Sequence, residues 1–175
     1  MKTKYPAYIV LDIPEPFASQ IIAIRSKCDS FRARIPAEIT VFGSTGTRHI
    51  KEGQEISFMI KELERIIPSI TRVSFTFSGL KPVPGSSGHA VFLDPNNKDA
   101  FIRIHEAIKN GTSFDYVSSE GKYSPHCSIG RVDKSSLENV RAQVIPGETI
   151  ELRKLSLVQF NPETADTEYL HSWSL

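Results

Sequence analysis

The order of predicted elements along the chain is the feature that most limits its fold. A strand, a helix, a second strand, a second helix and a third strand occur in that order twice, without close residue-level similarity between the halves. This order is compatible with parallel βαβ units, but two neighbouring segments that read as a hairpin favour antiparallel pairing. These patterns alone predict sheet and helix packed in two layers.

Strands are predicted where β-branched and aromatic residues cluster or alternate with polar ones. The alternation is clearest from Val73 to Phe77, where every second side chain is apolar, as expected of a half-buried strand. The other predicted strands cover residues 7–13, 38–42, 90–93, 124–132, 149–160 and 167–175. Segments rich in Gly, Pro or polar residues are predicted to be connections: 43–46, 82–88 and 111–121.

Helices are predicted where apolar residues recur three or four positions apart. In chain order, these positions are Phe17, Ile21, Ile24 and Cys28; Ile56, Met59, Ile60, Leu63 and Ile67; Phe101, Ile104 and Ile108; and Leu137, Val140 and Val144. Pro68 ends the second helix. Asn97 is predicted to cap the third, with Gly111 just past its end. Ser135 and Glu138 have the spacing of a capping box for the fourth.

Composition and charge exclude several classes of protein. A chain of 175 residues is expected to form a single domain, residues 1–175, and we expect a monomer. The formal net charge of +1 gives no bulk attraction to duplex DNA or to an anionic membrane. No apolar run approaches the roughly 18–20 residues of a membrane span. Two cysteines without a Cys-x-x-Cys pair, and a start without an apolar signal segment, favour the cytoplasm.

The five histidines differ in their settings. His105 and His171 lie within a predicted helix and strand, and His89 opens a strand, so structural roles are expected for all three. His49 lies in a predicted loop, where functional residues are more frequent. No two histidines have a zinc-site spacing with carboxylates, so no metal site is expected.

The fifth histidine stands at the start of a predicted strand with a hydroxyl two residues later. Side chains alternate across a strand, so His126 and Ser128 share one face, and Cys127 and Ile129 share the apolar face toward the core. The hydroxyl can donate to a phosphoryl oxygen, and the imidazole can transfer a proton near neutral pH. This pair suits phosphate chemistry, although any exposed strand face can carry the same spacing.

A strand in the first half carries a matching pair. Glu38 and Thr40 share one face of the predicted strand 38–42, with apolar side chains on the other face. Glu38 precedes His126 by the same number of residues as Thr40 precedes Ser128. The two halves therefore present matching strands, each with an acid or base followed by a hydroxyl.

Residues 124–131, Ser-Pro-His-Cys-Ser-Ile-Gly-Arg, resemble the second signature of the two-histidine phosphoesterase superfamily. This group includes bacterial 2′-5′ RNA ligases and 2′,3′-cyclic nucleotide phosphodiesterases, and carries His-x-Thr/Ser-x, with apolar x, once in each of two lobes. Residues 36–41, Pro-Ala-Glu-Ile-Thr-Val, stand where the first copy belongs, with Glu38 in place of the histidine. The resemblance implies an α+β fold of two pseudo-symmetric lobes around strands 36–42 and 124–132. Each lobe is an antiparallel sheet backed by helices, and the motif strands face a central cleft.

The resemblance also implies a chemistry without metal or cofactor, acting on small nucleotide or RNA-end phosphodiesters. His126 would donate a proton, Glu38 would be a substitute base, and Thr40 and Ser128 would hold the phosphate. Four further residues are expected to line the cleft: Arg48, His49, Lys122 and Tyr123.

Three functions remain open from the sequence. The first is an enzyme that transfers or hydrolyses phosphodiesters, with activity weakened by Glu38. The second is an inactive module on the same fold that binds a nucleotide, an RNA end or a protein. The third is an α+β domain in which the paired motifs are coincidental.

Overall fold

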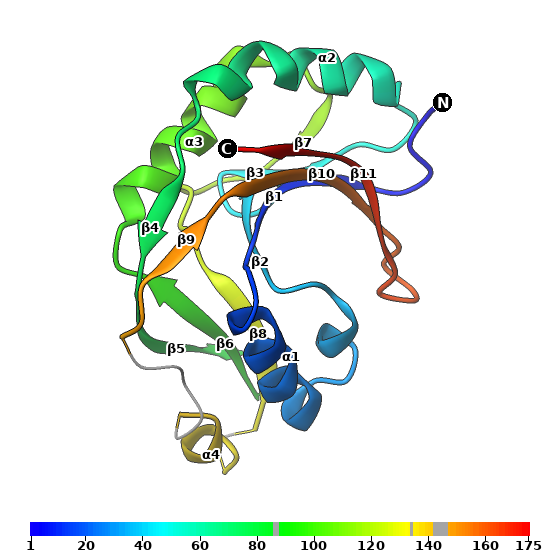
Figure 1. Ribbon diagram of the computed structural model, residues 1–175. Coiled ribbons are helices and arrows are strands. Elements are labelled where there is room, and N and C mark those ends of the chain that lie inside the picture. Colours follow the sequence, from blue (N-terminus) through cyan, green and yellow to red (C-terminus); the bar gives the residue numbers. More distant parts are fainter. Residues whose placement is uncertain (86–87, 134, 142–146) are drawn as a thin grey trace.

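The computed structural model describes residues 1–85, 88–133, 135–141 and 147–175 (Figure 1). Every named strand pairing among these residues is antiparallel. The α+β class with antiparallel sheets, predicted from the hairpin and the family resemblance, is therefore confirmed. The symmetry relation between the lobes stays a prediction.

The largest sheet combines strands from both ends of the chain. Its strand order is β11-β10-β1-β3-β7, and β2 also pairs with β1. Strand β1 lies in the interior of the protein, where its residues Ala7, Ile9 and Leu11 are fully inaccessible to solvent. The bounds of the six strands are β1 (Ala7–Asp12), β2 (Glu38–Phe42), β3 (Thr47–Ile50), β7 (Tyr116–Ser118), β10 (Lys154–Phe160) and β11 (Thr167–Ser174).

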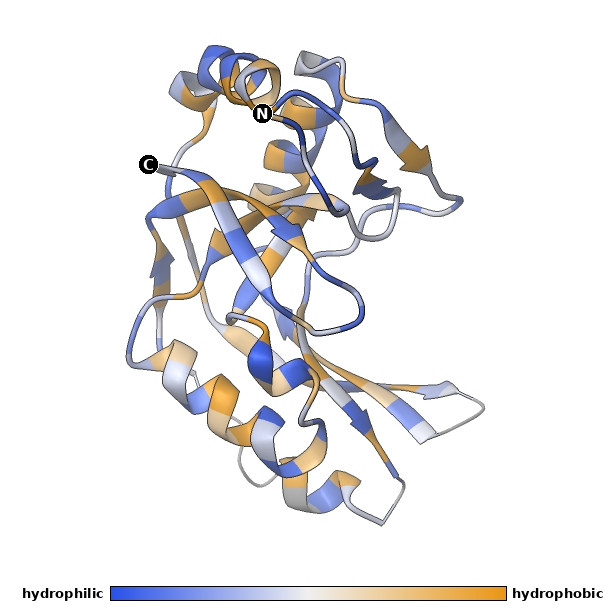
Figure 2. Cartoon of the chain, turned by 90° about the vertical axis from the view of Figure 1, so that its right-hand side faces the viewer, coloured by the Kyte–Doolittle hydropathy of each residue, from blue (hydrophilic) through white to orange (hydrophobic). Residues whose placement is uncertain are grey.

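Two smaller sheets complete the β-structure. The three-stranded sheet has the order β5-β6-β8, with β5 (Phe77–Gly85), β6 (Gly88–Pro95) and β8 (Cys127–Val132). The two-stranded sheet pairs β4 (Val73–Phe75) with β9 (Ile150–Leu152). Figure 2 shows hydrophobic and hydrophilic residues alternating along strands, as expected where one face of a sheet is buried.

The helices link the two halves of the chain through packing. Helix α1, from the first half, packs against β8, whereas α3, from the second half, packs against β2 (Figure 1). Helix α2 packs beside α3. The helical elements are α1 (Phe17–Cys28), η1 (Arg32–Arg34), α2 (Ile56–Ile66), η2 (Ile67–Ser69), α3 (Lys98–Gly111) and α4 (Leu137–Arg141).

The structure corrects several predicted assignments of strands and loops. The strand predicted over 73–77 is divided at Thr76 between β4 and β5, which belong to different sheets. The strand predicted over 124–132 begins only at Cys127. The single strand predicted over 149–160 is two strands in different sheets, β9 and β10, separated at Arg153. The predicted connection 82–88 contains the end of β5, because an edge strand tolerates the missing N–H groups of Pro82 and Pro84. Residues 47–50 and 116–118, which the sequence predicts to lie in loops, form the strands β3 and β7.

Helix ends also differ from the predictions. Gly111 is the last residue of α3 and not the residue after it. A Cβ at this position would lie 2.7 Å from Ile66 Cγ2, so the glycine allows α2 and α3 to approach. Asn97 is the N-cap residue, but its side chain donates to the Ser74 carbonyl at 3.1 Å and not to the helix. Val144 lies outside the described residues.

One apolar core connects the sheets with α1, α2 and α3. No helix of the described residues is long and apolar enough to cross a membrane.

Candidate active site

Strand β2 carries two polar side chains on the face that turns away from the core. Ile39 and Val41 are fully buried, whereas Glu38 and Thr40 are half-buried on the opposite face. The Thr40 hydroxyl donates a hydrogen bond to Glu38 Oε2 at 2.9 Å. The alternation expected from the sequence thus places both side chains together.

The second pair is presented by β8. Cys127 and Ile129 are fully buried, and Ser128 lies on the other face. His126 directly precedes the strand, and its Nδ1–H donates to the Ser124 carbonyl at 2.8 Å. Phe92 meets the imidazole edge to face, with ring centroids 4.6 Å apart. These contacts orient the ring and leave Nε2 as the nitrogen available for proton transfer.

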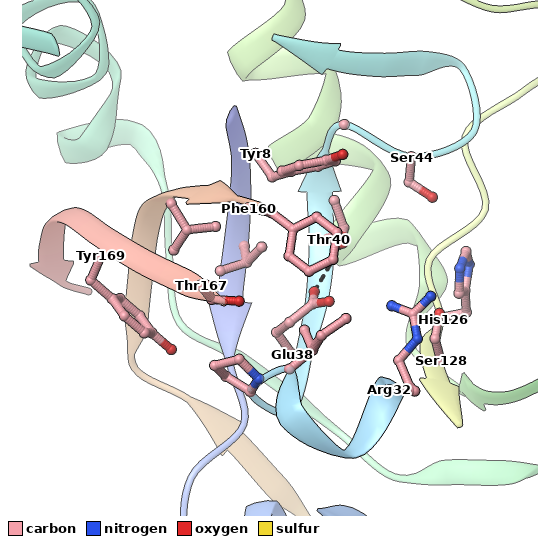
Figure 3. A pocket seen from close by; sticks show the side chains of 15 residues that line it. Tyr8, Arg32, Glu38, Thr40, Ser44, His126, Ser128, Phe160, Thr167 and Tyr169 are labelled. Carbon is pink, nitrogen blue, oxygen red and sulfur yellow. Dashed lines mark hydrogen bonds between the residues drawn. The ribbon is translucent and has the colours of Figure 1, made fainter. Parts of the chain in front are cut away.

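Both pairs line one cavity of about 260 Å³ between the large sheet and β8 (Figure 3). Its wall also includes the turn η1 and side chains from β1, β10 and β11. The lining residues are Tyr8, Val10, Arg32, Ile35, Pro36, Glu38, Thr40, Gly43, Ser44, His126, Ser128, Val158, Phe160, Thr167 and Tyr169.

Aromatic side chains form one side of this cavity. Tyr8 and Phe160 meet edge to face at a centroid distance of 6.3 Å, and Phe31 meets Phe160 in the same way at 6.2 Å. The Tyr169 hydroxyl donates to Asp12 Oδ1 at 3.0 Å. An aromatic wall beside polar groups suits a flat ring such as a nucleobase.

The carboxyl group of Glu38 has a raised pKa. Burial disfavours its charged form and is the largest cause. The charge of Arg25, the hydrogen bond from Thr40, and the charges of Arg32 and His126 act in the opposite direction. The environment therefore moves this carboxyl toward the pH range in which it can exchange a proton near neutrality.

A fully buried arginine lies beneath the two motif strands. Arg25 is inaccessible to solvent, and its Nε donates to the Ser128 carbonyl at 2.9 Å. Its Nη1 donates to the carbonyls of Ile35 at 2.6 Å and Pro36 at 3.1 Å. Sequence reasoning missed this residue, although it lies four positions after Ile21 on the apolar face of the helix.

Sequence reasoning also missed other residues that line the cavity, among them Arg32 and Ser44. Arg32 belongs to the short turn η1, and Ser44 follows β2. Neither stands in a strand or helix pattern, so no periodicity could have indicated them.

None of the four further residues expected at the cleft is among those lining the cavity. Arg48 and Lys122 are exposed, and the ring of His49, on β3, contacts the ring of Tyr8. Tyr123 is buried and donates through its hydroxyl to the Thr40 carbonyl at 2.9 Å. Tyr123 therefore supports β2 from the core side.

Tyr123 stacks on the imidazole of His105, with ring centroids 4.3 Å apart. His105 is almost fully buried, and its Nδ1–H donates to the Val41 carbonyl at 2.8 Å. Burial lowers its pKa. The structural role expected for His105 agrees with these contacts. Among the residues that the structure describes, no group of three or more His, Cys, Asp or Glu side chains is placed to hold a metal.

Comparison with known families agrees with this geometry. The sequence model of the 2'-5' RNA ligase superfamily matches residues 13–163. The chain belongs to the 2'-5' RNA ligase superfamily. The match includes both motif strands, and the resemblance predicted from them is confirmed. Membership of this superfamily of ligases and phosphoesterases also agrees with the interpretation as an enzyme.

Solved structures show that the superfamily fold extends over the whole chain. Apo E. coli LigT has a TM-score of 0.61 and 16% identity, covering 99% of this chain and 98% of LigT. TT0787 of Thermus thermophilus has a TM-score of 0.65 and 14% identity, covering 100% and 98%. LigT complexed with 3'-AMP has a TM-score of 0.58 and 16% identity, covering 99% and 98%. Among curated protein sequences, none is significantly similar to this chain.

Proposed function

We propose that this protein is a metal-independent phosphoesterase that acts on phosphodiesters of small nucleotides or RNA ends. The observation that carries the proposal is the meeting of Glu38 and Thr40 with His126 and Ser128 in one cavity. Two proton-transferring groups beside two hydroxyls suit in-line displacement at phosphorus.

In the proposed reaction, a 2′,3′-cyclic phosphodiester lies between the two pairs. The Glu38 carboxylate takes a proton from water while the water oxygen forms a bond to phosphorus. The bond from phosphorus to one ribose oxygen breaks, and the His126 imidazolium protonates that oxygen through Nε2. The product is a nucleoside monophosphate, and the two protein groups end with their proton states exchanged.

Nucleotide ligands of a relative support this substrate class. E. coli LigT has been solved in complex with phosphate, with ATP and with 3'-AMP. The aromatic side of the present cavity, at Tyr8 and Phe160, fits a nucleobase beside a bound phosphate.

Hydrolysis of 2′,3′-cyclic nucleotides and 2′-5′-linked dinucleotides, measured in EDTA, tests the proposal. Wild type is expected to be slow, since a carboxylate is a less suitable base than an imidazole. His126→Ala should abolish activity, and Glu38→Gln should lower it by about 10²-fold or more. Glu38→His should raise activity by restoring a histidine pair. His171→Ala, at an exposed histidine outside the cavity, is the matched control and should keep wild-type activity.

The outcomes separate the enzyme from a binding module. Inactivity of both wild type and Glu38→His on all substrates would contradict catalysis and leave nucleotide binding as the function. Full activity of His126→Ala would show that the proton donor is a different residue.

A further inference from the structure

The Arg32 side chain enters the cavity from an element separate from the two motif strands. In Figure 3 its guanidinium lies between the Glu38 carboxylate and His126. Within the described part of the chain, the hydrogen bonds of Arg32 use its backbone. Its N–H donates to Asp29 Oδ1 at 2.8 Å, and its carbonyl accepts hydrogen bonds from two other residues. The N–H groups of the planar Arg32 guanidinium are therefore available to bind a ligand.

The turn that carries Arg32 is held against the second motif strand. Asp29 accepts hydrogen bonds from the backbone N–H of Arg32 and, at 3.1 Å, from that of Arg131. The buried Arg25 donates to carbonyls that follow η1 and to the carbonyl of Ser128. These ties fix the backbone of Arg32 relative to the strand that holds Ser128, so the side chain starts from a defined place beside the cavity.

The charges around the cavity favour a cation beside a bound phosphate. Glu38 puts an anion where the family resemblance implies a histidine, and an ionised carboxylate repels a phosphate. Arg25 is close, but it is buried and already donates to backbone carbonyls. Of the described residues that line the cavity, Arg32 is the one with a permanently charged cationic side chain.

We propose that Arg32 binds the phosphoryl group of the substrate through paired N–H donors on two non-bridging oxygens. It thereby offsets the negative charge that Glu38 introduces where the family resemblance implies a histidine. This inference rests on the proposed function, which places a phosphate between Thr40 and Ser128. A guanidinium matches phosphate oxygens bidentately, and such charge-assisted hydrogen bonds are among the stronger ones in proteins.

Titration with inorganic phosphate, followed through the His126 ring signals by NMR, tests this assignment without requiring turnover. Arg32→Met is expected to raise the dissociation constant of phosphate about tenfold or more, because both the positive charge and the N–H donors of the guanidinium are lost. Arg32→Lys should recover part of the affinity for phosphate, since an ammonium group keeps the charge but lacks the paired N–H donors of a guanidinium. On a hydrolysed substrate, Arg32→Met should raise KM and lower kcat.

Arg34→Met is the matched control, because it removes the same charge from the same turn. Arg34 pairs with Asp166 at 3.0 Å and does not line the cavity, so this variant should bind phosphate as wild type does. Circular dichroism spectra and melting temperatures establish that each variant is folded.

The outcomes distinguish this inference from the proposed hydrolysis. Wild-type phosphate affinity in folded Arg32→Met, equal losses in Arg32→Met and Arg34→Met, or no phosphate binding by the wild type would each overturn the role of Arg32. Arg32-dependent phosphate binding without hydrolysis of any substrate would support Arg32 as the anion-binding residue and contradict only the proposed catalysis.

Discussion

At the scale of single residues, the fold changes the acid–base properties of Glu38. Burial raises its pKa above the ordinary value of glutamate, despite opposing charges from Arg25 and Arg32. The folded protein therefore binds this proton more tightly than the unfolded chain does. The resulting stabilisation is fully present below the ordinary glutamate pKa, and it is lost as the pH rises through the raised value.

Glu38→Gln is consequently expected to be more stable than wild type at neutral pH, because the amide never becomes an anion in this site. Near pH 4 both side chains are neutral, and the two proteins should melt at the same temperature. Melting temperatures from pH 4 to 8 measure the difference. Glu64→Gln, at an exposed position of α2, is the control and should show no such dependence. A constant difference at every pH, or a less stable Glu38→Gln at pH 8, would contradict the prediction.

Among the elements of the fold, β8 lies directly against the segment after α1 at Gly130. Its φ is +149°, and a Cβ there would lie 2.5 Å from Asp29 Cβ. The register between β6 and β8 shifts at this place, between Val91 and Phe92. Asp29 also holds the turn η1 through the N–H of Arg32. The motif strand and the turn therefore meet at a glycine that no larger residue can replace without displacement.

Gly130→Ala is expected to lower the free energy of unfolding by about 1–3 kcal/mol, from the steric overlap and the backbone strain. It should also weaken phosphate binding, because displacement of Asp29 moves the turn that carries Arg32. Urea denaturation measures the first effect and the phosphate titration measures the second. Gly121→Ala is the control, because its φ is +101° but no atom lies within 4 Å of the added Cβ. Equal stability losses in the two variants would show that the contact with Asp29 is unimportant.

At the scale of the whole molecule, Arg25 joins parts of the structure that are distant in sequence. It lies on α1, and it hydrogen-bonds to the segment before β2 and to Ser128 on β8. Removing it takes a donor from the buried carbonyl of Ile35 and from the partly buried carbonyls of Pro36 and Ser128, and such losses are costly.

Arg25→Met is expected to lower the free energy of unfolding by about 3–5 kcal/mol, which is large for a domain of this size. Arg25→Lys should fall between it and wild type, because an ammonium cannot reach every carbonyl that the guanidinium reaches. Urea denaturation measures both, and Arg25→Lys keeps the comparison possible if Arg25→Met does not fold. Arg103→Met, at an exposed site on α3, should change stability by less than about 0.5 kcal/mol. A loss in Arg25→Met no larger than in Arg103→Met would contradict this role.

Which side chains share a face could be predicted from the sequence alone. Alternation along a strand is a local property of the backbone, so the pairing of Glu38 with Thr40 and of His126 with Ser128 could be read directly. The same locality identified most helices and the core strands. The family resemblance then supplied the antiparallel arrangement, which periodicity alone left open.

Which separate segments meet could be seen only in the folded protein. The division of 149–160 between two sheets depends on the partners of β9 and β10, which lie far away in the chain. The burial of Tyr123 and the entry of Arg32 into the cavity likewise depend on packing between elements. Local periodicity records whether a position faces the core, but not which distant residue lies opposite it. The cavity is formed by residues that are distant in sequence. For this reason, only the folded chain shows that Arg32 and the aromatic side chains of Tyr8 and Phe160 line it.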